Sequence, residues 1–115
     1  MLPEIEPAAC GLKSSVIESM RGVFALFPQV EQVILYGSRA KGNYKNGSDI
    51  DLCLLGPSLT LPVLLNIDNA LDDLLLPYKI DLSLLHHLDN AALRAHIERV
   101  GVSFYSKQPS SAVIS

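Results

Sequence analysis

The stretch VILYGSRAKGNYKNGSDIDLCLLG, residues 33–56, constrains the fold more than any other part of the chain. Two apolar runs typical of buried strands flank a polar segment, which contains Gly37-Ser38 and ends with Asp49-Ile50-Asp51. Carboxylates at the start of a hydrophobic strand lose hydration and repel each other unless a cation accompanies them. The stretch therefore indicates two buried strands and a site that needs a positive charge from outside the chain.

The size and composition of the chain limit what surrounds this site. Its 115 residues allow one hydrophobic core and leave little room for a second lobe. Hydrophobic residues make up 49% of the chain, but no apolar run approaches the roughly 20 residues of a membrane span. The start lacks the basic and apolar regions of a signal peptide, so we predict a cytoplasmic globular protein. The net charge of −3 argues against extensive nucleic-acid binding, which requires a basic surface.

The spacing of apolar residues predicts helices and strands in alternation. The predicted helices cover residues 12–27, 61–76 and, capped by Asp89 or Asn90, the segment up to Val100. The predicted strands cover residues 33–36, 50–55 and 79–85, with VSFY at 102–105 as a fourth candidate. Residues 39–48 are predicted as a short helix or turn followed by a loop.

This order of elements predicts a two-layer α/β or α+β domain over residues 12–105. Residues 1–11 then form an N-terminal arm, and residues 106–115 form a flexible tail. The two cysteines, Cys10 and Cys53, are too few for a disulfide framework, and no His or Cys stands nearby at the spacing of a zinc site.

Three aspartates are the strongest candidates for chemistry. Side chains alternate along a strand, so Asp49 and Asp51 share one face, with Cα atoms roughly 6.5–7 Å apart. Asp81 has the same setting on the strand at 79–85, and the three carboxylates converge if the two strands are neighbours. Hard oxygen ligands without His or Cys select Mg²⁺ or Mn²⁺. Such a cluster can seat two ions, about 3.5–4 Å apart, that activate an attacking oxygen and stabilise a leaving one.

The Gly-Ser turn supplies the complementary half of a nucleoside-triphosphate site. Glycine at a strand end allows close approach of the backbone to an anion, and N–H groups at the start of the next helix favour phosphate. Ser38 adds a hydroxyl donor, while Arg39 and Lys41 can neutralise phosphate charge. Each half alone is weak evidence, because Gly-Ser is common in turns and Asp-x-Asp also occurs in calcium loops and glycosyltransferases. The alternatives are solvated aspartates on a half-exposed sheet and a solvated turn for the two basic residues.

Together, Gly37-Ser38, ten further residues, Asp49-x-Asp51 and Asp81 on a later strand resemble the signature of the DNA polymerase β-type nucleotidyltransferases. In particular, the chain is similar to the minimal nucleotidyltransferases, single-domain proteins of about this length. The resemblance runs from the first helix to Tyr105 and includes HIERVGVSFY, which is similar to the usual ending of that family. It implies a mixed β-sheet with helices packed on one face and the site on the open side.

The resemblance also implies roles for the site residues. Asp49 and Asp51 would bind both of two Mg²⁺ ions, and Asp81 would bind the catalytic ion and act as the base. Gly37 and Ser38 would contact the triphosphate, with ATP as the favoured substrate. An acceptor hydroxyl would then attack the α-phosphate and release pyrophosphate.

The resemblance further implies a partner. Minimal nucleotidyltransferases are often encoded beside helical HEPN proteins, and in many pairs the HEPN toxin receives AMP on a tyrosine from its antitoxin. The expected function is therefore that of a protein AMP-transferase with an antitoxin role. Two alternatives remain open: a binding module that docks on a HEPN partner without catalysis, and half of an aminoglycoside-type nucleotidyltransferase. The leucine-rich segment 61–76 fits either a core or an interface with a homo- or hetero-oligomeric partner.

Overall fold

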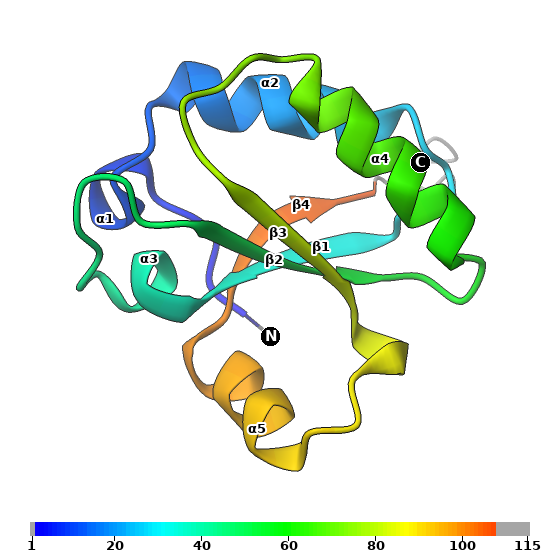
Figure 1. The fold of residues 1–115 in the computed structure, drawn as a ribbon. Helices are drawn as coiled ribbons and strands as arrows, with labels where there is room; N and C mark the ends of the chain where they lie inside the picture. Colours follow the sequence, from blue (N-terminus) through cyan, green and yellow to red (C-terminus); the bar gives the residue numbers. More distant parts are fainter. Residues whose placement is uncertain (1, 108–115) are drawn as a thin grey trace, which may run out of the picture.

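The structure, a computed structural model, describes residues 2–107 as a four-stranded sheet with flanking helices (Figure 1). In chain order the elements are α1 (Pro7–Cys10), α2 (Ser14–Ala25), β1 (Gln32–Tyr36), α3 (Gly37–Lys41), β2 (Ile50–Leu55), α4 (Leu61–Asp72), β3 (Ile80–Leu84), the 3₁₀ turn η1 (Leu85–His87), α5 (Ala91–Val100) and β4 (Val102–Ser106). Of the predicted tail, residues 108–115 lie outside the described residues. No helix within residues 2–107 has the length and apolar character needed to cross a membrane.

The strands follow the order β3-β2-β1-β4 across the sheet. β1 pairs antiparallel with both β2 and β4, while β2 and β3 are parallel. A parallel pair requires a crossover connection, and α4 provides it by passing over one face of the sheet. This mixed sheet confirms the predicted α+β fold class.

The hydrophobic core lies between the sheet and the helices α2 and α4 (Figure 1). Alternate residues of the strands point into it, because successive side chains take opposite faces. Phe24 of α2 and Phe104 of β4 are fully buried, and their rings meet edge to face with centroids 6.1 Å apart. Ile67 and Leu71 of α4 are buried in the same cluster. This packing fixes the strands whose other face carries the candidate site.

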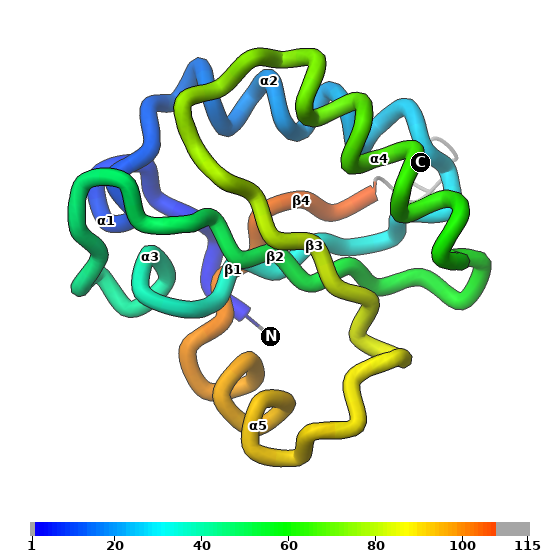
Figure 2. The backbone as a smooth tube through the Cα atoms, in the orientation of Figure 1, coloured from blue at the N-terminus to red at the C-terminus, as the bar shows by residue number. Residues whose placement is uncertain are grey.

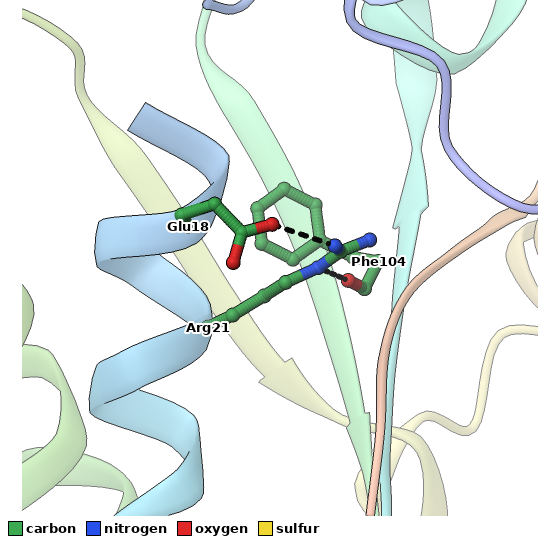
Figure 3. A network of polar contacts seen from close by, with 3 residues as sticks. All are labelled: Glu18, Arg21 and Phe104. Atoms are coloured by element: carbon green, nitrogen blue, oxygen red, sulfur yellow. Dashed lines mark hydrogen bonds and ion pairs between the residues drawn. The ribbon is translucent and has the colours of Figure 1, made fainter. Parts of the chain in front are cut away.

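A polar contact holds α2 against the edge strand β4 (Figure 3). Arg21 donates from Nε to the carbonyl oxygen of Phe104 at 2.8 Å, and its Nη1 lies 3.1 Å from Glu18 Oε2. Since the carboxylate is largely exposed, the ion pair contributes at most about 1 kcal/mol. The bond to the strand carbonyl is the part that fixes the helix relative to the sheet.

The opposite face of the sheet is covered only in part, by α5 (Figure 1). Ile97 of α5 packs against Ile34 of β1 and Cys53 of β2 in a second, smaller cluster. The prediction from the sequence placed the helices on one face of the sheet, whereas α5 covers part of the second face. Beyond α5, this face carries the polar side chains of Asp51 and Asp81 at the end where β2 and β3 begin.

The leucine-rich helix ends earlier than predicted. α4 stops at Asp72 rather than at Leu76, and Leu75 takes a left-handed backbone conformation with φ of 55°. Leu75 is 87% exposed, and Leu61 and Leu65 on α4 are 56% and 64% exposed. These leucines are therefore not part of the core, and their role at an interface stays a prediction.

The predicted N-terminal arm contacts the sheet. The backbone N–H of Ile5 donates to the carbonyl of Ser103, and the N–H of Ser103 donates to the carbonyl of Pro3. Ile5 and Cys10 are buried, the latter at the end of α1. The four-residue helix α1 was not predicted, because one turn is too short to show a helical period.

Asn90 rather than Asp89 caps α5, and we expect the loss of this cap to lower the stability of the fold. Asn90 Oδ1 accepts a hydrogen bond from the N–H of Leu93 at 3.1 Å. We expect Asn90→Ala to lower the free energy of unfolding by about 1 kcal/mol, because the first turn loses its acceptor. Urea denaturation measures the loss. Asp89→Ala is the control, and it should change stability by less than about 0.5 kcal/mol; the reverse order would contradict this assignment of the cap.

Candidate active site

The β2–β3 pair brings two of the three candidate aspartates side by side. Asp51 and Asp81 are direct partners in the parallel register, on strands that lie about 4.8 Å apart in any sheet. Asp49 directly precedes β2 and is half-buried, whereas Asp81 is exposed. The hypothesis from the sequence required the strands that carry Asp51 and Asp81 to be neighbours. These strands, β2 and β3, are neighbours in the sheet.

The Gly-Ser turn lies directly against Asp51, one member of this pair. Tyr36, the last residue of β1, pairs with Asp51, so the chain enters α3 beside the Asp51 side chain. Gly37 has a φ of 76°, a conformation that residues with a Cβ rarely adopt. A Cβ at Gly37 would also collide with Asp51 Oδ2. The backbone conformation thus favours glycine here, and a larger residue would also have to move the Asp51 carboxylate. Half-buried Ser38 follows it.

The electrostatics of the site show that the carboxylates act on one another. Burial is the main factor that raises the pKa of Asp51, and the charges of Asp81 and Asp49 raise it further, while His96 opposes them. Burial likewise raises the pKa of Tyr36, with contributions from Asp51 and Asp81 against the lowering effect of Ser83. Without a cation, the ionised cluster is therefore unfavourable in the folded state.

This interaction predicts a pH dependence of stability in the protein stripped of metal ions. Because the pKa of Asp51 is higher in the folded than in the unfolded chain, the folded state holds the proton more tightly. The penalty from ionised Asp51 is absent below the unfolded pKa of about 3.9 and grows as pH rises through the raised value. We expect the melting temperature of Asp51→Asn minus that of wild type, measured in EDTA, to increase over this window. A difference that does not vary with pH would contradict the raised pKa.

The donor chemistry of the three aspartates suits Mg²⁺ or Mn²⁺. All of the candidate ligands are carboxylate oxygens, which hard divalent cations prefer. The mutual repulsion at Asp51 is what a bound cation would relieve. Within residues 2–107, however, no three His, Cys, Asp or Glu side chains are gathered closely enough to hold an ion as they stand. The three aspartates suit the ion by the chemistry of their oxygens, but their carboxylates would have to move closer together to hold it.

The structure corrects the prediction that Arg39 contacts phosphate. Arg39 is only 2% exposed, and its guanidinium is bound to backbone carbonyls instead of facing the open side of the sheet. The local sequence could not reveal this, because partners such as Cys10 and Tyr78 belong to other segments of the chain. Lys41, at the end of α3, is exposed and remains a candidate for phosphate contact.

Sequence reasoning missed three residues that share the face of Asp51. Tyr36 and His96 meet edge to face, with ring centroids 6.2 Å apart and planes at 82°. Ser83, two residues after Asp81 on the same side of β3, influences the pKa of Tyr36 and of Cys53. Strand alternation could have indicated Ser83, whereas His96 reaches the site from α5 through tertiary packing alone.

Two neighbouring histidines, His86 and His87, lie outside the candidate site. His86 and His87 are exposed on η1, beyond the ends of the strands that begin at the aspartates. Their rings lie edge to face with centroids 4.6 Å apart. Neither is among the residues that influence the pKa of Asp51, so neither is assigned to the site.

The mixed sheet, the glycine turn and the paired aspartates define a domain of the nucleotidyltransferase class. Residues 18–110 match the family described as "Polymerase beta, Nucleotidyltransferase", and the chain belongs to that family. No curated protein matches the chain.

Solved structures share this fold. One is a toxin–antitoxin complex with AMP-PNP, with a TM-score of 0.65 and 19% identity over 84% of this chain and 78% of the other. A second is the MntA–HepT toxin–antitoxin, with a TM-score of 0.62 and 16% identity over 88% and 79% of the two chains. A third contains a tri-AMPylated HEPN toxin from Shewanella oneidensis with an MNT antitoxin, with a TM-score of 0.54 and 19% identity over 86% and 73%. At these identities the likeness establishes the fold.

Proposed function

We propose that the chain is a metal-dependent nucleotidyltransferase that moves AMP from ATP to a hydroxyl group of a protein. The observation that carries the proposal is the contact between Gly37 and Asp51, with Asp51 in turn paired in register with Asp81. The Gly37 turn and these aspartates therefore lie at one end of one sheet, which supports a role for the turn in phosphate binding and for the carboxylates in cation binding. Membership of the polymerase β nucleotidyltransferase family supports the same chemistry.

The residues of the chain take distinct parts in the proposed reaction. The backbone at Gly37 and the hydroxyl of Ser38 hold the triphosphate, and exposed Lys41 neutralises part of its charge. Asp81 accepts the proton of the acceptor hydroxyl as its oxygen bonds to the α-phosphorus. The bond between the α-phosphorus and the oxygen that bridges it to the β-phosphate breaks, and pyrophosphate leaves.

Mg²⁺ or Mn²⁺ would be held by Asp49, Asp51 and Asp81. When bound, the ions would neutralise charge on the α-phosphate and on the leaving pyrophosphate. Without a cation, burial raises the pKa of Asp51, and the charges of Asp81 and Asp49 raise it further. Cation binding and catalytic competence are therefore coupled in this proposal.

A protein acceptor is supported by the solved structures that share the fold of this chain. Structures with the same fold include a toxin–antitoxin complex in which the HEPN toxin is AMPylated. We therefore propose a HEPN-type helical protein as the acceptor, an antitoxin role for this chain and the cytoplasm as its location.

Label transfer tests this function directly. The chain is incubated with Mg²⁺ and, as the proposed acceptor, a HEPN-type protein of the same organism, using ATP labelled at the α-phosphate or at the γ-phosphate. Nucleotidyl transfer predicts label on the acceptor from α-labelled ATP alone, and none with Asp49→Asn. Label from γ-labelled ATP would indicate phosphoryl transfer instead and would contradict the proposal.

A binding module is the second candidate, and one observation favours it. The three aspartates are not gathered into a ligand group within the described part of the chain. In that case the chain would neutralise its helical partner by docking alone. A tight complex that Asp49→Asn leaves intact, without label on either protein, would support this alternative.

A further inference from the structure

Arg39 is a buried cation that binds three backbone carbonyl groups. Its Nε donates to the carbonyl of Ser48 at 3.1 Å, and its Nη1 donates to the carbonyl of Cys10 at 2.9 Å and more weakly to that of Gly11 at 3.5 Å. Within residues 2–107 no carboxylate lies within ion-pair distance of it, since the ion pair found there joins Arg21 and Glu18. The buried charge is thus balanced by oriented carbonyl dipoles.

Two aromatic rings also contact the guanidinium. The Arg39 Cζ atom lies 5.2 Å from the ring centre of Tyr44 and 5.0 Å from that of Tyr78. Both distances are within the range of cation–π attraction. Tyr44 belongs to the loop between α3 and β2, while Tyr78 belongs to the segment that leads into β3. Arg39 therefore joins elements that are not neighbours in the sequence.

The segments that meet at Arg39 are the segments that carry the proposed active site. Arg39 lies on α3, two residues after Gly37, and its partner Ser48 directly precedes Asp49. Tyr78 precedes Asp81 by three residues. Figure 2 shows α1, α3 and the loop that leads into β2 together at one end of the sheet. The Arg39 side chain thus contacts all three segments that lead to the candidate site.

We propose that Arg39 is a positioning residue that sets the separation of Asp49, Asp81 and the Gly37 turn. Its effect on the reaction rests on the proposed nucleotidyl transfer, whereas its effect on the local backbone does not. Arginine suits the task because its planar fork directs Nε and Nη1 to two different carbonyls while both faces remain free for rings. Lysine, a point charge without a fork, cannot satisfy the same set of partners.

The test compares Arg39→Lys with a pair of variants at Tyr78. Tyr78→Leu removes the aromatic face that contacts the guanidinium, and Tyr78→Phe retains it and is the matched control. Amide hydrogen exchange is followed along the whole chain, in the absence of metal and nucleotide. Mn²⁺ affinity in the presence of ATP and the kcat and KM of transfer are measured on the same proteins.

We expect faster exchange in residues 42–50 of Arg39→Lys, while the amides of α2 and of the central strands stay protected. Mn²⁺ affinity should fall about tenfold or more, as it does when partners of metal ligands are lost. kcat should fall by a similar factor and more than KM for ATP changes. Tyr78→Leu should reproduce part of each effect, and Tyr78→Phe should not. A double variant that combines Arg39→Lys with Tyr78→Leu should lose less than the sum of the two single losses, because both substitutions disrupt the same contact.

Exchange and Mn²⁺ affinity that match wild type in Arg39→Lys would overturn the positioning role. Uniformly faster exchange over the whole chain would also overturn it, since Arg39 would then support the fold in general. If exchange changes locally but wild type itself neither binds Mn²⁺ nor transfers AMP, the positioning of the backbone stands and the proposed function fails. The two ideas are therefore separable in one set of measurements.

Discussion

Asp51→Asn is expected to abolish AMP transfer while the fold remains intact. Asp51 is in contact with the Gly37 turn and in register with Asp81, so it lies at the centre of the candidate site. An amide cannot supply the charge that holds a divalent cation, and cation stabilisation of the transition state is worth several kcal/mol. We expect transfer to fall about a thousandfold or more, measured with α-labelled ATP and the HEPN acceptor.

The stability of the metal-free protein, in contrast to its activity, should not be lowered by Asp51→Asn. Burial and two neighbouring carboxylates disfavour ionised Asp51, so a neutral amide relieves strain in the metal-free protein. The melting temperature of Asp51→Asn in EDTA should equal or exceed that of wild type at neutral pH. Asp72→Asn, an exposed carboxylate at the end of α4, is the control and should change neither transfer nor stability appreciably. Transfer by Asp51→Asn within tenfold of wild type would remove Asp51 from the mechanism.

Gly37→Ala is expected to impair both the site and the fold. The left-handed conformation at φ of 76° costs a residue with a Cβ about 1–2 kcal/mol. The added Cβ would also come too close to Asp51 Oδ2, so the Asp51 carboxylate would have to move. A displacement of about 1 Å in a catalytic group can reduce the rate about a hundredfold, and we expect a loss of that order in kcat.

Gly47→Ala is a matched control for the backbone component. Gly47 has a φ of 83°, and an added Cβ there would meet nothing within 4 Å. It should therefore show a similar loss of stability in urea denaturation but retain most of the transfer activity. Equal losses of activity in the two variants would show that backbone strain, and not the contact with Asp51, explains the effect of Gly37→Ala.

The residues that face one another across the strands were the most predictable part of the molecule. The strand Ile50–Leu55 has the predicted bounds, because a continuous apolar run between turn residues defines it locally. Asp81 was predicted to face Asp51 from strand alternation, on the condition that the two strands are neighbours. The parallel register Asp51–Asp81 meets that condition, although alternation alone cannot determine which strands pair.

The elements that were missed depend on contacts between distant segments. The excess of leucines extended the predicted helix to Leu76, whereas α4 ends at Asp72 and the chain turns at Leu75 toward β3. Arg39 looked like a phosphate ligand because it follows the Gly-Ser turn, and its burial results from Cys10, Ser48 and Tyr78. No local sequence pattern can predict contacts among four separate segments of the chain.

The location of bound cations tests the central claim most directly. Crystals of the chain grown with Mn²⁺ and a non-hydrolysable ATP analogue allow the ions to be found by their anomalous scattering. The account predicts Mn²⁺ between the carboxylates of Asp49, Asp51 and Asp81, with the triphosphate against Gly37 and Ser38. Nucleotide bound elsewhere, or Mn²⁺ absent from these carboxylates at saturating concentration, would contradict it.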